Sequence, residues 1–224
     1  MKKKLLIFGT GGGAELAFKK IKKKNDVDIY GFVEYQKYYK KKTFLNYPVI
    51  KFENLNKSHV KNFLMFIHKN FDNLNQDRTK IYKLLKKKNF KFYSYVDPSL
   101  DLNFKIGENS FILSNQSICE DVKIGNNVVM WSHNHVGDRT VIKDNVWITS
   151  CVSIGGDCVI GEDTFIGMNA TIAHDTKIER KNLIGANSLI TSNTRKFDTF
   201  IVKTTKKTNI KSTDFVKFYN FDDK

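Results

Sequence analysis

The side chains of this chain best suited to proton transfer are its histidines, because an unperturbed imidazole titrates near neutral pH. Two of them flank an asparagine in the stretch His133-Asn134-His135, and a carboxylate follows at Asp138. A carboxylate is a weak base unless its surroundings raise its pKa. The candidate catalytic residues are therefore His135, His133 and Asp138. The structural alternative is that both histidines are solvated turn residues.

A glycine-rich turn near the N-terminus is the second candidate site. The run Gly9-Thr10-Gly11-Gly12-Gly13 follows an apolar segment, and residues 14–24 then show helical spacing. Glycines at such a strand-to-helix turn let backbone N–H groups approach a phosphate at the start of the helix. A second apolar run, residues 28–33, ends at Glu34, where dinucleotide-type folds place an acidic residue. A tight turn without a ligand is the alternative interpretation.

The second half of the chain repeats every six residues. From Ile106 to Ile190 the leading position is aliphatic in all 15 hexads, and 13 of these residues are Ile. The next position is glycine in seven hexads, and the fifth is Ser, Thr, Ala, Val or Cys in 12. Asn134 is an exception at this fifth position, which marks the hexad that holds both candidate histidines. A helix of 3.6 residues per turn cannot produce a strict period of six.

Short flat strands joined by turns do produce this period. Each hexad then forms one side of a triangular coil, with the aliphatic residue filling the interior and the small fifth residue pointing inward. We expect the glycine of each hexad to permit the backbone turn. Three hexads make one coil, so residues 106–189 predict about 4.7 coils and a prism roughly 22 Å tall at the spacing of parallel strands.

The first half predicts a small Rossmann-like βαβ domain. Strands are expected over residues 3–8, 28–33, 63–67 and 90–95, with helices over 14–24 and 79–85. Asp97-Pro98-Ser99 is the expected junction. The predicted fold class is therefore α/β plus all-β. We divide the chain into residues 1–97, a β-helix over 98–191 and a C-terminal tail over 192–224.

Length and composition exclude several classes of protein. The chain has 224 residues, 41% hydrophobic and 27% charged. No apolar stretch approaches the ~18–20 residues of a membrane span, and the apolar run at the start is too short for a signal peptide. We therefore expect no integral membrane segment and a cytoplasmic protein. Three cysteines without a CxxC spacing do not form a disulfide framework.

The net charge of +15 does not indicate nucleic-acid binding. Only four of the 38 basic residues are arginine, the side chain that recognises bases and phosphates in a bidentate manner. The charge is also uneven, with 23 basic and 7 acidic residues over 1–95 but 7 and 12 over 96–190. A small phosphorylated ligand at the basic front domain fits this distribution, so no nucleic-acid partner is expected.

The repeat resembles the left-handed β-helix of hexapeptide-repeat acyltransferases. With the glycine turn it resembles, over residues 3–195, the sugar acyltransferases of the sialic-acid O-acetyltransferase NeuD type, which include PglD and GDP-perosamine N-acetyltransferase. The resemblance implies a homotrimer that uses acetyl-CoA to acetylate an amino or hydroxyl group of a nucleotide sugar in surface-glycan synthesis. It implies no metal. The implied substrate-binding residues are Gly9, Gly11, Gly12, Gly13, Glu34 and Tyr35.

The resemblance also indicates where the acetyl group is transferred. The histidine base of the family falls at Asp138, so the usual base is absent, and His135 is the favoured replacement. The implied CoA contacts fall at Trp147, Met168 and Ala186, with an exposed Trp147 packing against pantetheine or filling a trimer interface. Gly155 and Gly156 are expected to give backbone access to the oxyanion or the thioester. His174 lies two coils beyond Asp138, about 10 Å away, and is interpreted mainly as a solvated turn residue.

Two other functions remain open. β-Helix carbonic anhydrases place histidine ligands across a subunit interface, and His133, His135 and His174 supply suitable nitrogen ligands for such a metal-dependent lyase. The glycine turn argues against this alternative. The loss of the usual base at Asp138 suggests instead a scaffold that binds CoA or nucleotide without turnover. The chain end lacks the usual G-x-P-A-K sequence, and the tail, including residues 215–219, is expected to cap the prism or pack on a neighbour.

Overall fold

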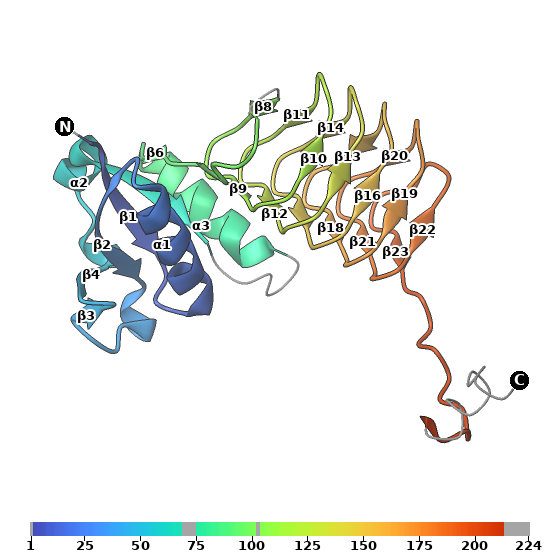
Figure 1. The fold of residues 1–224 in the computed structure, drawn as a ribbon. Coiled ribbons are helices and arrows are strands. Elements are labelled where there is room, and N and C mark those ends of the chain that lie inside the picture. Colours follow the sequence, from blue (N-terminus) through green and yellow to red (C-terminus); the bar gives the residue numbers. More distant parts are fainter. Residues whose placement is uncertain (1, 69–74, 102–103, 213–224) are drawn as a thin grey trace, which may run out of the picture.

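The computed structural model describes residues 2–68, 75–101 and 104–212. It has two parts, a layered N-terminal domain and a long three-sided prism that extends from it (Figure 1). The final described residues, 201–212, are exposed and lead away from the prism. Among the described residues, no helix is both long and apolar enough to span a bilayer.

The N-terminal domain is built on a six-stranded sheet whose spatial order is β3-β4-β2-β1-β5-β6. All neighbours are parallel except the β3–β4 pair, so the predicted Rossmann-like arrangement is confirmed. The β3–β4 hairpin was not predicted, because its short segments lack clear alternation. The strands are β1 (Lys4–Phe8), β2 (Asp28–Glu34), β3 (Thr43–Phe44), β4 (Tyr47–Lys51), β5 (Phe63–Ile67) and β6 (Lys91–Phe92).

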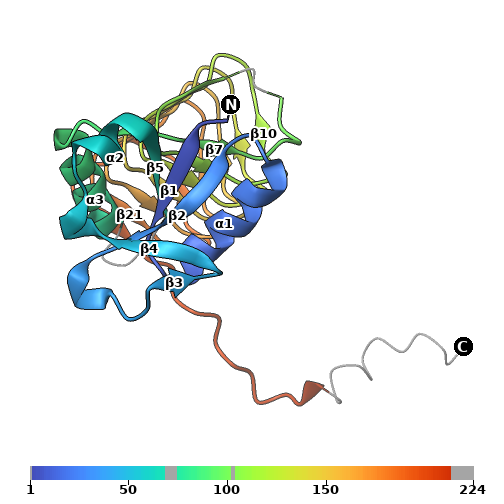
Figure 2. The ribbon, with the colours of Figure 1, turned by 90° about the vertical axis from the view of Figure 1, so that its left-hand side faces the viewer.

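Helices cover both faces of this sheet, with α1 on one side and α2 and α3 on the other (Figure 2). The core beneath α1 continues into apolar residues of the prism, including Phe111 and Trp147. The core beneath α3 joins Met65 to Ile81 and Leu85. The helices are α1 (Gly12–Lys24), α2 (Lys57–Asn62) and α3 (Gln76–Lys87), with short 3-10 turns η1 (Gln36–Tyr38) and η2 (Phe52–Asn54).

The prism has three parallel sheets, each made of one strand per coil, and adjacent strands pair residues 18 apart. The β8 face holds β8 (Lys105–Ile106), β11 (Lys123–Ile124), β14 (Val141–Ile142), β17 (Val159–Ile160) and β20 (Lys177–Ile178). The β9 face holds β7 (Tyr95–Val96), β9 (Phe111–Ile112), β12 (Val129–Met130), β15 (Trp147–Ile148), β18 (Phe165–Ile166), β21 (Leu183–Ile184) and β23 (Thr199–Phe200). The β10 face holds β10 (Ser117–Ile118), β13 (His135–Val136), β16 (Ser153–Ile154), β19 (Thr171–Ile172) and β22 (Leu189–Ile190).

The hexapeptide periodicity therefore predicted the β-helix correctly. The aliphatic leading residues from Ile124 to Ile190 fill the interior, and the small fifth residues are buried with them. The prism also extends beyond the expected boundaries of 98 and 191. Residues 95–96 begin the β9 face and residues 199–200 end it, so the strand expected over 90–95 is split between the two domains.

The turn mechanism expected for the glycines is wrong. The left-handed backbone falls on the fourth hexad position, from Asn109 to Asn187, and ten of these 14 residues are Asn or Asp. Those side chains tolerate a positive φ better than other non-glycine residues do. The glycines at the second position serve close packing between coils instead. A Cβ on Gly137 would lie 2.3 Å from the backbone nitrogen of Gly156 in the next coil.

Three edges join the three faces, and we name them by their surroundings. The docked edge, between the β8 and β9 faces, comprises residues 107–110, 125–128, 143–146, 161–164 and 179–182. The charged edge, between the β10 and β8 faces, comprises 119–122, 137–140, 155–158 and 173–176. The open edge, between the β9 and β10 faces, comprises 113–116, 131–134, 149–152, 167–170 and 185–188.

Arg78 of α3 fastens the N-terminal domain to the docked edge. Its guanidinium is fully buried and donates to the carbonyls of Ile67, Asn109 and Asn127. The amide side chains of Asn109, Asn127 and Asn145 form a hydrogen-bonded ladder beneath it, with steps of 2.8 and 2.9 Å. Burial lowers the pKa of Arg78 to about 9, so the clamp is still cationic at neutral pH.

Candidate active site

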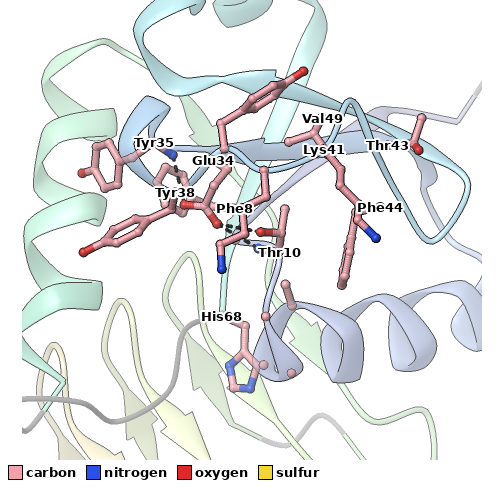
Figure 3. Close-up of a pocket in the computed structure, with 17 residues that line it drawn as sticks. Phe8, Thr10, Glu34, Tyr35, Tyr38, Lys41, Thr43, Phe44, Val49 and His68 are labelled. Atoms are coloured by element: carbon pink, nitrogen blue, oxygen red, sulfur yellow. Dashed lines mark hydrogen bonds between the residues drawn. The ribbon is translucent and has the colours of Figure 1, made fainter.

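The glycine turn borders a cavity of about 540 Å³ in the N-terminal domain (Figure 3). It lies at the carboxyl ends of β1 and β2, where open α/β sheets bind their ligands. Backbone at Gly11 and Gly12 faces open space, since a Cβ added to either would meet nothing within 4 Å. The six residues predicted to bind substrate all line the cavity: Gly9, Gly11, Gly12, Gly13, Glu34 and Tyr35.

Glu34 shapes the glycine turn through its carboxylate. It accepts hydrogen bonds from the N–H and hydroxyl of Thr10, at 3.1 and 3.0 Å, and from the N–H of Tyr35 at 3.0 Å. Gly9 has a φ of 107°, a conformation that favours glycine, and its N–H donates to the carbonyl of Val33. The carboxylate therefore holds the turn in shape against β2, while the glycine N–H groups face the cavity.

His68 lies at the floor of this cavity and was not singled out in the sequence because it carries no motif. It is buried, and its ring stacks on Trp147 with ring centroids 6.0 Å apart. Burial, with a smaller contribution from Arg78, lowers the pKa of His68 to about 3, so the imidazole is neutral at physiological pH. Its position at the end of β5 was the available signal, since that end faces the same side of the sheet as the glycine turn.

Trp147 is not the exposed indole expected from the sequence. Its side chain is only 1% exposed and lies between the domains, against His68 and the apolar residues of the β9 face. The expectation followed from the outward direction of the sixth hexad position. That direction is correct, but the N-terminal domain covers this face. Trp147 is therefore an interdomain packing residue and does not reach a surface on which CoA can lie.

His133 and His135 are both exposed and lie on neighbouring parts of the prism. His133 is on the open edge, 3.3 Å from the amide of Asn115, and His135 is on the β10 face, 3.2 Å from the hydroxyl of Ser117. Within the described residues, no ion pair joins either imidazole to a carboxylate. Asn134 points inward, and its amide caps backbone groups of Trp131 and Val152.

The charged edge carries a network of ionised side chains. Arg139 forms two parallel hydrogen bonds to Asp157, at 2.6 and 2.7 Å, and pairs with Asp138. The hydrogen bond from Arg139 lowers the pKa of Asp157. On the other side of Asp157, its carboxylate lies 3.6 Å from Nε2 of His174. The sequence did not reveal this network, because its members come from three different coils.

Gly156 leaves a gap in the charged edge. At the same hexad position on the docked edge, the N–H of Asn126 donates to the side chain of Asp144 in the next coil. The N–H of Asp138 lacks such a side-chain acceptor because residue 156 is glycine. Backbone N–H groups are thus accessible beside a space without a side chain, the geometry that an oxyanion site requires.

The remaining predicted CoA contacts lie elsewhere on the prism. Met168 and Ala186 are exposed and occupy the same hexad position in successive coils of the open edge. The β10 face separates them from Asp138 and Gly156. The structure also places His133, His135 and His174 on three different elements, and the described residues form no group of three potential metal ligands.

Comparisons with known proteins support this architecture. Residues 139–174 and 157–192 match the family model described as bacterial transferase hexapeptide (six repeats). The repeat predicted from the sequence is therefore confirmed for this part of the prism. No curated protein matches the chain in sequence.

Several solved structures share the fold of the whole chain. A mutant of perosamine N-acetyltransferase from Caulobacter crescentus, solved with CoA and GDP-perosamine, is 16% identical, with a TM-score of 0.72 over 86% of this chain and 90% of that one. The acetyltransferase domain of PglB from Neisseria gonorrhoeae is 18% identical, with a TM-score of 0.56 over 85% and 92%. WeeI from Acinetobacter baumannii is 15% identical, with a TM-score of 0.51 over 84% and 94%. These similarities establish a Rossmann-like domain followed by a left-handed β-helix.

Proposed function

We propose that the chain is an acyltransferase that moves an acetyl group from acetyl-CoA to an amino or hydroxyl group of a nucleotide-linked sugar. The observation that carries this proposal is the pairing of a glycine-lined cavity with a hexapeptide-repeat prism in one chain. The similar structure from Caulobacter crescentus binds CoA and GDP-perosamine and shares this pairing over most of its length.

The N-terminal cavity is the proposed nucleotide-sugar site. The N–H groups of Gly11, Gly12 and Gly13 begin α1, and a helix N-terminus favours a phosphate through its dipole and its unpaired donors. Lys40 and Lys41 line the same cavity and add positive charge. Tyr35 and Tyr38 supply aromatic surface at its rim, which suits the base or the sugar.

The prism is the proposed acyl-donor site. Gly155 and Gly156 give the thioester access to backbone N–H groups, which stabilise the oxyanion of a tetrahedral intermediate. Met168 and Ala186 are retained as CoA contacts on the open edge. Sequence reasoning leaves His135, His133 or Asp138 as the proton acceptor. No metal takes part in this scheme, and both substrates place the reaction in the cytoplasm.

The proposed assembly is a homotrimer. Within one chain, the open edge with Met168 and the charged edge with Gly156 lie on opposite sides of the β10 face. Packing one prism against another brings the open edge of one subunit to the charged edge of its neighbour, which completes the site. Exposed apolar side chains at Met168 and Leu189, 57% and 66% accessible, support a partner at this face. Light scattering coupled to gel filtration tests the expected threefold mass.

The decisive experiment is a free-thiol release assay with acetyl-CoA and a panel of UDP-, GDP- and dTDP-linked sugars, with and without an amino group. We expect thiol release with one member of the panel and a matching mass gain of one acetyl group on that sugar. Gly12→Asp is the diagnostic variant, because aspartate suits the first turn of a helix but repels a phosphate. It should raise the KM for the sugar at least about tenfold by loss of charge-assisted hydrogen bonds, with unchanged CoA affinity. No thiol release with any sugar would contradict the proposal.

A further inference from the structure

We propose that the proton acceptor of the reaction is His174, positioned by Asp157, and not His135 or Asp138. This inference rests on the proposed acyltransferase function and names a residue that the sequence did not favour. It assigns the charged edge of the prism a chemical role. The argument uses the contacts of His174, the state of Asp138 and the missing side chain at Gly156.

His174 has the surroundings of an oriented base. Its Nε2 faces the Asp157 carboxylate at 3.6 Å, and Asp157 is in turn held by the two hydrogen bonds from Arg139. A carboxylate on one ring nitrogen fixes the tautomer and leaves the other nitrogen free to accept a proton. Sites without substrate commonly hold such pairs at longer range than in the reacting complex.

The other nitrogen, Nδ1, faces the gap above Gly156. A Cβ on Gly156 would lie 3.4 Å from His174 Nδ1 and 2.7 Å from Asp138 Oδ1, so both side chains lean over the glycine from the coils on either side. The two atoms are therefore closer than the ~10 Å between strands two coils apart. The gap lies next to the backbone N–H groups proposed to bind the oxyanion, and Nδ1 borders it directly.

Asp138 is poorly suited to accept the proton. It is paired with Arg139, a permanently charged partner that favours the ionised carboxylate. His133 and His135 contact only neutral side chains and have no carboxylate to orient the ring or to stabilise an imidazolium. His174 is the histidine of the prism that has both an acidic partner and an opening to the gap.

The proposed step balances as follows for an amino sugar. The neutral nitrogen attacks the thioester carbonyl, forming a C–N bond and an oxyanion held by backbone N–H groups. His174 Nδ1 takes one proton from the attacking nitrogen, and Asp157 stabilises the resulting imidazolium. The C–S bond then breaks, and the imidazolium returns the proton to the leaving thiolate. The products are the N-acetylated sugar and CoA, with His174 neutral again.

The test compares His174→Ala and His174→Gln with wild type in the thiol-release assay. Removal of a general base typically lowers the rate about 10²–10⁴-fold, so we expect kcat to fall by this amount with nearly unchanged KM for both substrates. Added imidazole should restore part of the activity of His174→Ala and none of that of wild type. Asp157→Asn keeps an αL-compatible residue and should lower kcat by a smaller factor, also without a change in KM.

Two further variants complete the design. Arg180→Gln is the matched control, because Arg180 is exposed at the same hexad position on the docked edge and should retain full activity. His135→Ala represents the competing assignment. Loss of kcat in His135→Ala with retained kcat in His174→Ala would overturn the inference, as would a His174→Ala enzyme that imidazole does not rescue. If wild type releases no thiol but binds CoA, the proposed function fails and this inference fails with it.

Discussion

Two edges of the same prism use one backbone position in opposite ways. On the docked edge the left-handed fourth position holds Asn109, Asn127 and Asn145, buried beneath Arg78. On the charged edge the same position holds Arg139 and Asp157, exposed and ion-paired. The backbone conformation is common to both edges, so the difference lies in what covers them.

The comparison shows how a repeating scaffold separates structural from chemical roles. Neutral amides satisfy each other and the buried guanidinium without leaving an unpaired charge in a dry interface. Ionised side chains on the charged edge stay in water, where their pairing costs and contributes little to folding. They are therefore free to serve a substrate. Four predictions test this division, from the largest expected effect to the smallest.

Removal of the buried clamp should have the largest effect. Arg78→Met leaves the carbonyls of Ile67, Asn109 and Asn127 without their donor in a buried joint. We expect a loss of about 3–5 kcal/mol in the free energy of unfolding. Denaturant titration measures this loss, and Arg180→Met on an exposed part of the same edge should change stability by less than ~0.5 kcal/mol. Equal effects of the two variants would contradict the special role of the docked edge.

Paired alanine substitutions compare the two edges directly. Asn127→Ala and Asp157→Ala both place alanine at a positive φ, a cost of about 1 kcal/mol. Only Asn127→Ala also breaks buried hydrogen bonds to Asn109 and Asn145, which adds about 1–3 kcal/mol. Thermal unfolding of both variants should show the larger decrease for Asn127→Ala. A larger decrease for Asp157→Ala would mean that the ion pairs stabilise the prism more than the amide ladder.

The buried side should also be the acid-sensitive side. Burial holds the pKa of His68 at about 3, against 6.5 for the exposed group, so the unfolded chain binds the extra proton between these values. Stability contributed by neutral His68 is complete above pH 6.5 and falls as the pH drops towards 3. The expected slope is about 1.4 kcal/mol per pH unit in this window. Denaturation at pH 5 and 7 should show a smaller pH dependence in His68→Phe than in wild type; an unchanged dependence would exclude His68 as its source.

The smallest effect is expected for the exposed ion pairs. Arg139→Gln removes the hydrogen bonds to Asp157 and the pair with Asp138. Because all three side chains are solvated, we expect stability to change by less than about 1 kcal/mol. The same variant should weaken catalysis, because Asp157 loses the partner that fixes it. A large loss of stability in thermal unfolding would show that the charged edge is structural after all.

Much of this fold is predictable from the sequence because its signals are periodic. A strict hexad with Ile at the leading position predicts the prism, and the glycine turn between two apolar runs predicts the parallel sheet and α1. The β3–β4 hairpin was missed because its strands are short and stand next to a lysine run, residues 40–42. The role of the hexad glycines was misassigned because sequence spacing shows where a residue is small, and not whether φ or close packing requires it.

The site was only partly predictable, for a physical reason. The glycines and Glu34 are neighbours in sequence or at the ends of adjacent strands, so their position at one cavity follows from the fold. Asp157 and His174 meet because they stand on adjacent coils, and single-residue inspection gave His174 no partner. Trp147 was misjudged because its burial depends on the N-terminal domain, whose docking onto the β9 face leaves no trace in the hexad.

The constant 18-residue rise between coils gives the charged edge the character of a ruler. A side chain moved by one or more whole coils returns to the same edge, in the same orientation, displaced only along the prism axis. A chemical group can therefore change its address by multiples of 18 residues without any new fold. In this chain an imidazole stands at residue 174, two such divisions from Asp138, with the intervening division left open by Gly156.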